Sequence, residues 1–294
     1  MLTLIALFVL GLIFGSFVNA LVWRLHQQSL VISHQSSVKK TESQLATGDS
    51  RPATKNLSVW NGRSMCPNCR HELAAKDLIP VFSWLALSGR CRYCKAPISR
   101  QYPLIELITG VIFAASYHFW PQALVSGDQK LLFIIWLATS IGLLALAIYD
   151  FRWLLLPNKI LYPTFFVALA GRLSYILAFA PDEAHSFGLL LLSLVVASGL
   201  FWLIFTLSRG KWIGYGDVRL GWILGTLLAD PAMSFLMIFL ASVIGTIFAL
   251  PALISGQSGL ASKLPFGPFL IAATMLVVLF GDSLVSWYRH LLNI

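Results

Sequence analysis

Long apolar segments, separated by shorter polar ones, run through most of this 294-residue chain. A run of roughly 18 or more apolar residues is typical of a helix that crosses a membrane. Eight segments have this pattern or come close to it, and together they predict an all-α polytopic membrane protein with about eight transmembrane helices. The predicted helices are Leu2–Trp23, Pro103–Trp120, Leu131–Tyr149, Ile160–Phe179, Phe187–Leu207, Val218–Ala229, Ala232–Ile254 and Pro268–Trp287.

The sixth segment, Val218–Ala229, is the weakest of the eight. As a helix its 12 residues rise only about 18 Å, which is short of a hydrocarbon core about 30 Å thick. We therefore expect either a tilted helix that is extended by its flanking residues or a re-entrant half-helix.

The longest polar interruption, Arg24 to Arg100, follows the first segment. It holds 12 of the 21 basic residues and four acidic ones, so it carries +8 of the net charge of +9. Because basic loops stay in the cytoplasm, we expect the N-terminus outside and this loop inside. Membrane topology thus accounts for the basic excess, and we expect the lipid bilayer, not nucleic acid, as partner. The polar composition of residues 26–58 predicts a mobile, solvated segment.

All four cysteines of the chain lie in the second part of this loop. Cys66 and Cys69 form one Cys-x2-Cys pair, and Cys91 and Cys94 form another after 21 intervening residues. Two such pairs can surround one tetrahedral Zn²⁺ with four thiolates. Two disulfides, unusual in a reducing cytoplasm, and a redox Cys-x-x-Cys pair are the alternatives. We favour a structural Zn²⁺ in a small cytoplasmic domain, residues 60–100, inserted after the first helix.

Two aspartates lie at the ends of apolar segments. Asp150 ends the third segment and Asp217 begins the sixth, with two well-formed segments between them. Two crossings return the chain to the same face, so both aspartates should lie at the cytoplasmic boundary. Carboxylates that face each other share a proton, and such a pair can activate water and protonate a carbonyl oxygen. This arrangement predicts aspartic peptide hydrolysis.

Two glycines, Gly214 and Gly216, precede the second aspartate. Without a Cβ they allow a sharp turn and the close approach of a substrate backbone. The alternative is that both aspartates are interfacial, with Asp150 paired to Arg152 and Asp217 paired to Arg219. Glu106, near the start of the second segment, is a weaker candidate whose simpler role is to stabilise the first turn of a helix.

Five motifs occur in order along nearly the whole chain. They are GSFVNALVWRL, the cysteine region that runs on to ISRQYPLIELITG, YDFRWLLLPN, GYGDVRLG and, from Leu264 to Leu270, LPFGPFL. Together they resemble the prepilin leader peptidases, also called type IV prepilin-like leader peptidase/N-methyltransferases. Each motif alone is weak evidence, but five in this order are highly specific.

The resemblance implies that Asp150 and Asp217 are the catalytic aspartates. It implies cleavage of the basic leader of type IV prepilins or type II secretion pseudopilin precursors, at the cytoplasmic face of a bacterial inner membrane. It also implies methylation of the new N-terminal residue with S-adenosylmethionine, an activity tied to the cysteine domain. The residues that hold this cofactor are not identified by any motif in the sequence.

Three parts of the chain follow from these patterns: a first transmembrane helix at 1–23, a cytoplasmic loop at 24–102 linked to methylation, and a membrane peptidase domain at 103–294. Two positions depart from the family pattern, since Asn158 stands where an aspartate is usual and Arg219 where a lysine is frequent.

A peptidase without methylation is the main alternative function. A transporter with carboxylates in an ion path and a non-enzymatic assembly scaffold are more distant ones.

Overall fold

The structure is a computed structural model that describes residues 1–41, 64–254 and 264–292. Within these ranges the regular elements are helices, and the only β pairing consists of two isolated bridges in the cysteine region, which confirms the all-α prediction. Six of the described helices are long and apolar enough to cross a membrane: Leu2–Leu30, Gly127–Trp153, Asn158–Phe179, Glu183–Ser208, Pro231–Pro251 and Gly267–Leu291. The chain is therefore a multi-pass membrane protein. The full count of eight spans stays a prediction.

The chain divides into two compact units, Met1–Ala114 and Ala115–Ile294. The first unit contains α1 (Leu2–Thr41), the short helices η2 (Ala75–Asp77) and α2 (Phe82–Ala86), and most of α3 (Gln101–His118). The second unit contains the end of α3 and all later helices, which carry both candidate aspartates.

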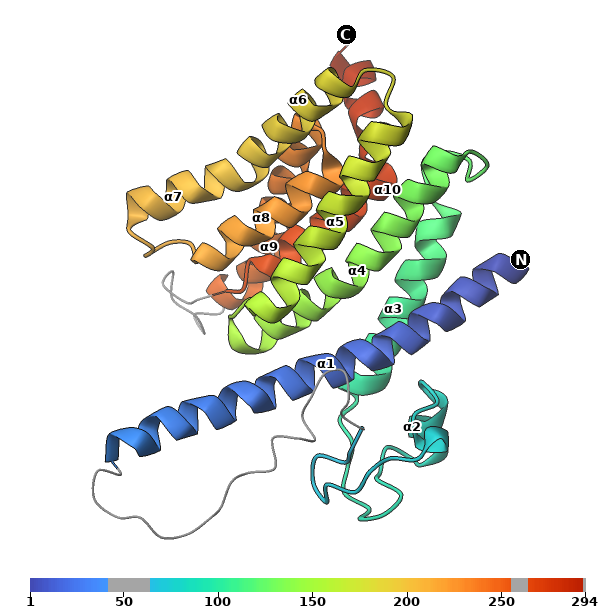
Figure 1. Ribbon diagram of the computed structural model, residues 1–294, viewed down its shortest axis with the longest axis vertical. Coiled ribbons are helices and arrows are strands. Elements are labelled where there is room, and N and C mark those ends of the chain that lie inside the picture. The colour runs from blue at the N-terminus through green and yellow to red at the C-terminus, as the bar shows by residue number, and fades with distance from the viewer. Residues whose placement is uncertain (42–63, 255–263, 293–294) are drawn as a thin grey trace. The chain divides into compact units, whose positions relative to one another are not determined.

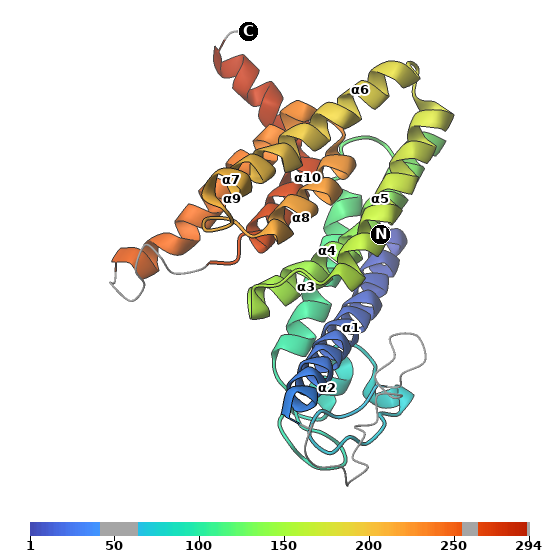
Figure 2. The ribbon, with the colours of Figure 1, turned by 60° about the vertical axis from the view of Figure 1, so that its left-hand side comes forward.

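Helices α1 and α3 cross closely, as Figure 1 and Figure 2 show. The crossing depends on glycine, because a Cβ built at Gly15 would lie 2.7 Å from the Cα of Glu106. One turn further along α1, the side-chain amide of Asn19 donates to the carbonyl oxygen of Tyr102 at 3.1 Å. Small and amide-bearing residues let membrane helices pack and bond across their interface, and that is the use of the opening motif.

Helix α1 extends beyond the predicted span Leu2–Trp23, because it continues to Thr41. Neither Gly nor Pro occurs between Gly15 and Thr41, so the chain contains no strong helix breaker there. Residues 24–41 are consequently helical, although we had assigned them to a loop. The remainder of the segment that we expected to be mobile, residues 42–58, lies outside the described residues, as do residues 60–63 of the expected cysteine domain.

The second unit is a helical bundle around α8. Its helices are α4 (Gly127–Trp153), α5 (Asn158–Phe179), α6 (Glu183–Leu194), the π-helical turn η3 (Val195–Gly199), α7 (Leu200–Ser208), α8 (Tyr215–Leu228), α9 (Pro231–Ile254) and α10 (Gly267–Leu292). Helix α8 packs against α5, α6, η3, α7, α9 and α10 (Figure 1). The candidate site is therefore built on the central helix of the bundle.

Helix α8 has 14 residues and rises about 21 Å, so it is shorter than a membrane span. Two of its glycines allow close backbone contact with the preceding span. A Cβ at Gly221 would collide with the carbonyl oxygen of Ala197, and one at Gly225 would lie 3.1 Å from the carbonyl oxygen of Ser193. The Ser193 hydroxyl donates to the carbonyl oxygen of Gly225 at 2.8 Å. Backbone contact and side-chain donors thus compensate for the short length of α8.

Arg172 of α5 completes the support of α8 at its C-terminal end. Its guanidinium donates to the carbonyl oxygens of Thr226 and Leu227 at 3.3 and 2.5 Å. The last carbonyls of a helix have no partner within the helix, and leaving them unpaired in a membrane costs free energy. No sequence motif points to Arg172, and this contact explains why a cation lies within a predicted span.

Candidate active site and metal site

Asp150 lies in the last turn of α4, where the helix stops. Its carbonyl oxygen accepts the hydrogen bond from Leu154 N–H at 2.8 Å, and Leu154 adopts the left-handed conformation with φ of +54°. The chain then turns towards α5. The Asp150 residue itself is buried, with 6% of its surface exposed.

The N-terminus of α10 lies directly against the Asp150 carboxylate. A Cβ built at Gly267, the first residue of α10, would lie 2.6 Å from Asp150 Oδ2. The backbone N–H of Gly267 faces the carboxylate, yet Oδ2 accepts no well-formed hydrogen bond from the described residues. A helix N-terminus favours a nearby negative charge. The LPFGPFL motif therefore reaches the first candidate aspartate, a contact that sequence analysis did not predict.

Asp217 is the third residue of α8, close to the helix start. Its N–H donates to the carbonyl oxygen of Gly214 at 3.1 Å, and its carboxylate accepts from the Gly214 N–H. The carboxylate also interacts electrostatically with that of Asp150. The Asp217 carboxylate is thus within electrostatic range of that of Asp150, although the nearest ends of their helices, Trp153 and Tyr215, are 62 residues apart.

The two neighbouring arginines do not neutralise these aspartates. Arg219 donates to the side-chain oxygen of Asn158 and stacks over Tyr215 at 5.1 Å from the ring centroid. Arg152 lies over the Trp153 ring at 5.3 Å. Among the described residues, neither aspartate forms an ion pair. This observation disfavours the alternative in which both are interfacial charges in surface salt bridges.

The two glycines before Asp217 differ in their surroundings. A Cβ at Gly216 would lie 3.1 Å from Leu156, so this glycine lets the start of α8 pack against the α4–α5 connection. A Cβ at Gly214 would meet nothing closer than 3.9 Å, and Gly214 has an ordinary φ of −76°. The space beside Gly214 is compatible with an approaching backbone, but a role for either glycine in substrate binding stays a prediction.

The four cysteines converge in the first unit. The sulfur atoms of Cys66, Cys69, Cys91 and Cys94 all lie within 4.8 Å of one another, and none of them forms a disulfide. Cys66 Sγ and Cys94 Sγ are 3.9 Å apart. Four sulfur atoms at about 2.3 Å from a tetrahedral Zn²⁺ would be separated by about 3.8 Å, so the cluster fits this ion.

Both cysteine pairs fold into the same tight turn. In the first, Arg70 N–H donates to the Cys66 carbonyl at 2.9 Å, and in the second, Lys95 N–H donates to the Cys91 carbonyl at 3.0 Å. Arg70 and Lys95 are left-handed, with φ of +57° and +60°. This conformation is costly for residues other than glycine. The repeated geometry aims both pairs of thiols at a common point, as binding of a single ion requires.

The thiols of the cluster differ in their affinity for protons. The backbone N–H of Ala96 lowers the pKa of Cys94 to about 6. The N–H of His71 acts in the same direction on Cys69, but loss of hydration and the neighbouring thiols raise its pKa to about 11. Four thiolates this close repel one another unless a cation is present, and metal binding releases their protons.

Comparison with known proteins gives matches along most of the chain. Residues 9–120 match the model of the bacterial peptidase A24 N-terminal domain, and residues 137–250 match that of the type IV leader peptidase family. Three similar proteins are each named prepilin leader peptidase/N-methyltransferase. The protein from Stutzerimonas stutzeri is 30% identical over 95% of this chain and 91% of its own length, and the one from Pseudomonas aeruginosa is 31% identical over 95% and 91%. The protein from Burkholderia pseudomallei strain 1026b is 34% identical over 93% of this chain and 84% of its own length. No solved structure matched the chain significantly.

Proposed function

The chain belongs to the type IV leader peptidase family, and we propose that it cleaves the basic leader from type IV prepilins or type II secretion pseudopilin precursors and then methylates the new N-terminus. The observation that carries the peptidase proposal is that the carboxylates of Asp150 and Asp217 are near enough to interact electrostatically, while neither has an ion-pair partner among the described residues.

In this proposal the two aspartates act as a general acid/base pair. Two carboxylates at close range do not both ionise cheaply, so they share one proton and titrate as a unit. The ionised member takes a proton from the attacking water, while the protonated member gives its proton to the carbonyl oxygen of the scissile bond. The unpartnered Asp150 Oδ2 supports this assignment, because a buried carboxylate oxygen needs a proton or a water as its partner.

The start of α10 has a positioning role in the proposed mechanism. Gly267 leaves the space that the Asp150 carboxylate fills, and the positive end of the α10 dipole stabilises the charge of that carboxylate. On the other side, Gly214 holds the Asp217 carboxylate through its backbone N–H. Both carboxylates are thus fixed by backbone groups, which do not change charge during the reaction.

The metal proposal assigns Zn²⁺ to Cys66, Cys69, Cys91 and Cys94. All four tetrahedral positions are filled by protein sulfur, so the ion would stabilise the fold of the cysteine region and would have no open position for a substrate. For the second activity, S-adenosylmethionine supplies an electrophilic methyl group. The chain's own contribution is to bind this donor and to bring the amine of the cleaved pilin to it.

We further propose the orientation that the charges of the long loop predict, with the N-terminus outside and the aspartates at the cytoplasmic face of the bacterial inner membrane. A substrate with a basic leader would keep that leader in the cytoplasm for the same electrostatic reason. The scissile bond would then lie at the depth of the aspartate pair, between an apolar helix in the bilayer and a charged leader in water.

The direct test uses Asp150→Asn and Asp217→Asn proteins, each purified in detergent and shown to retain the thermal unfolding midpoint of the parent. We expect cleavage of a cognate prepilin to fall by about 10³-fold or more in both, as in other enzymes where one member of a catalytic pair is lost. A folded variant that cleaves at a near-normal rate would refute the mechanism. Cleavage by the purified parent alone excludes the scaffold alternative, and the mass of the mature N-terminus decides whether methylation is retained.

A further inference from the structure

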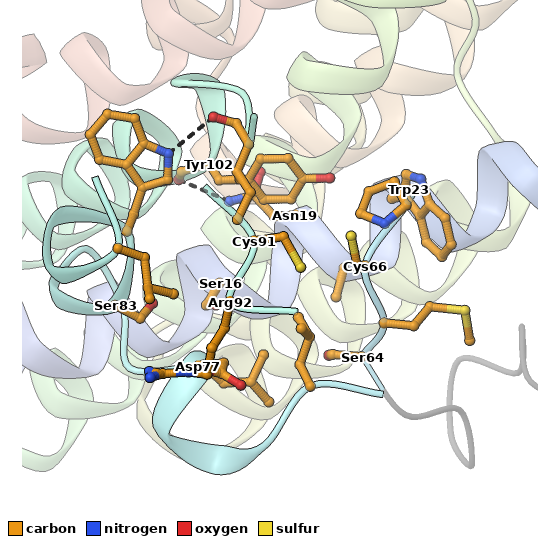
Figure 3. Close-up of a pocket in the computed structure, with 18 of the residues that line it drawn as sticks. Ser16, Asn19, Trp23, Ser64, Cys66, Asp77, Ser83, Cys91, Arg92 and Tyr102 are labelled. Carbon is orange, nitrogen blue, oxygen red and sulfur yellow. Dashed lines mark hydrogen bonds and ion pairs between the residues drawn. The ribbon is translucent and has the colours of Figure 1, made fainter. Parts of the chain in front are cut away.

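A pocket in the first unit combines aromatic, cationic and acidic groups beside the cysteine cluster. Its volume is about 140 Å³, and its wall is formed by α1, the cysteine region and the start of α3. Figure 3 shows the sulfur atoms of Cys66 and Cys91 in the middle of this lining, with Trp23 beside Cys66 and with Asp77 and Arg92 towards the lower edge.

The pocket contains one carboxylate without a cation, that of Glu106. The residue is 7% exposed, and its Oε2 accepts a hydrogen bond from Val81 N–H at 2.6 Å. The Ser16 hydroxyl is its other partner, and among the described residues no cation pairs with it. Helix stabilisation alone does not explain a buried position at the wall of a cavity. An ionised carboxylate that lies away from water is costly unless a cation or several donors face it.

The second acid of the pocket is already neutralised. Asp77 accepts from Arg92 Nε at 2.7 Å and from the Tyr93 hydroxyl at 3.2 Å, and its side chain is only 3% exposed. Glu106 is therefore the acidic group that remains available for a positively charged ligand.

The rest of the wall favours a ligand with a flat aromatic part. The indoles of Trp23 and Trp84 and the ring of Tyr102 line the pocket, together with aliphatic side chains. Trp84 is held in place because its indole N–H donates to the carbonyl oxygen of Ile98 at 3.1 Å. Aromatic faces bind nucleobases by stacking and attract cations through the ring quadrupole.

We propose that this pocket binds S-adenosylmethionine, with the Glu106 carboxylate facing the sulfonium and the aromatic side chains facing the adenine; the proposal rests on the methylating activity in the proposed function. This ligand joins a fixed cation to a nucleobase, which is the combination that the wall of the pocket offers. A cavity for a whole cofactor has at least about 300 Å³, so only one end of the ligand is enclosed here. The amino-acid part of the ligand, which the wall does not contact, then lies at the mouth.

The assignment also gives a direction for product release. Methyl transfer breaks the bond between carbon and the sulfonium and forms a bond from that carbon to the amine nitrogen, which loses a proton. The sulfur becomes a neutral thioether, so the charge attraction of Glu106 for the ligand ends with the reaction. The pocket should therefore hold the methyl donor more tightly than S-adenosylhomocysteine, the demethylated product.

Equilibrium dialysis with the full-length protein in detergent tests this assignment without any methylation assay. Binding of S-adenosylmethionine and of S-adenosylhomocysteine is measured for the parent, for Glu106→Gln and for the control Glu72→Gln, which removes an exposed carboxylate of the same unit outside the pocket. We expect Glu106→Gln to weaken binding of S-adenosylmethionine about tenfold or more and that of S-adenosylhomocysteine less than about threefold. The control should bind both like the parent. Equal effects on both ligands, or no effect, would overturn the assignment.

A second measurement does not depend on any variant. Ultraviolet irradiation of the parent with tritiated S-adenosylmethionine, followed by peptide mapping, should place the label on peptides that contain Trp23, Trp84 or Tyr102. Label confined to residues 115–294 would overturn the proposal, as would a parent that cleaves prepilin but binds no S-adenosylmethionine. In that last case the peptidase part of the proposed function stands. A parent that does not cleave would instead refute the proposed function itself.

Discussion

Replacing Gly267 by alanine should disable the aspartate pair without unfolding the protein. Gly267 is the first residue of α10, and a Cβ at this position would lie 2.6 Å from Asp150 Oδ2 and 3.4 Å from Asp150 Cγ. An ordinary van der Waals contact begins near 3.4 Å, so the carboxylate oxygen must move by about 0.8 Å. The movement has to occur within a buried residue whose carboxylate also interacts with that of Asp217.

The size of the expected effect follows from this displacement. A misplacement of about 1 Å in a catalytic group can reduce the rate about 10²-fold, whereas one extra methyl group in a packed interior costs about 1–3 kcal/mol of stability. Alanine is tolerated in a first helical turn, so the helix itself should not be disrupted. The Gly267→Ala protein should thus remain folded while kcat/KM for leader cleavage falls about 10²-fold.

The assay is cleavage of a purified prepilin in detergent, followed by gel shift or mass spectrometry at several substrate concentrations. Gly188→Ala is the matched control, because a Cβ at Gly188, in α6, would meet no atom within 4 Å. Both variants and the parent are assayed at a temperature well below the thermal unfolding midpoint of each. Cleavage by Gly267→Ala within about threefold of the Gly188→Ala rate would show that the position of Asp150 does not limit the reaction, and the mechanism based on this pair would fail.

Three other outcomes follow from the described contacts. Arg172→Met should destabilise the protein by about 1.5–3 kcal/mol, because the final carbonyls of α8 lose charged donors; thermal unfolding beside an Arg289→Met control checks this. Cys94→Ser should reduce bound Zn²⁺ from one ion per chain to about zero and abolish methylation while leader cleavage continues, as metal analysis and the mass of the mature pilin will show. Although burial acts to raise it, the hydrogen bond from Arg92 and the other donors hold the pKa of Asp77 below its usual 3.8. Asp77 therefore contributes stability above that pH, and the loss of thermal stability in Asp77→Asn should be present at pH 7 and disappear as the pH falls through the lowered pKa.

The helices were predictable because their signal is local. A long apolar run shows where a helix exists, and each of the eight predicted segments is helical in the structure. Helix ends are set by breakers and caps, and where these are missing an apolar run does not show where the helix ends, as after Trp23, where α1 continues to Thr41. The central position of the short helix α8 was not predictable either. Side chains of α5 and α6 donate hydrogen bonds to its backbone carbonyl oxygens, and no local sequence pattern reveals these contacts.

The candidate site was only partly predictable for the same reason. Counting two crossings between Asp150 and Asp217 was enough to expect both on one face, because alternation of spans needs no three-dimensional information. The contact of Gly267 with Asp150 joins positions 117 residues apart, and their proximity follows from helix packing alone. The same holds for the pocket around Glu106, which was a weak site candidate with a simpler role in a helix turn, because the surroundings of this residue come from three separate segments.

The two departures from the family pattern are a single contact in the folded protein. Asn158 and Arg219 are 61 residues apart, and the guanidinium of Arg219 donates to the side-chain oxygen of Asn158. An aspartate at position 158 would add a negative charge to this contact between the start of α5 and the first turns of α8, whereas asparagine supplies an acceptor without a charge. The longer, forked side chain of arginine keeps the contact and also stacks on Tyr215. Arg219 makes these contacts and forms no ion pair with Asp217 among the described residues, so the Asp217 carboxylate interacts with that of Asp150 without a paired cation.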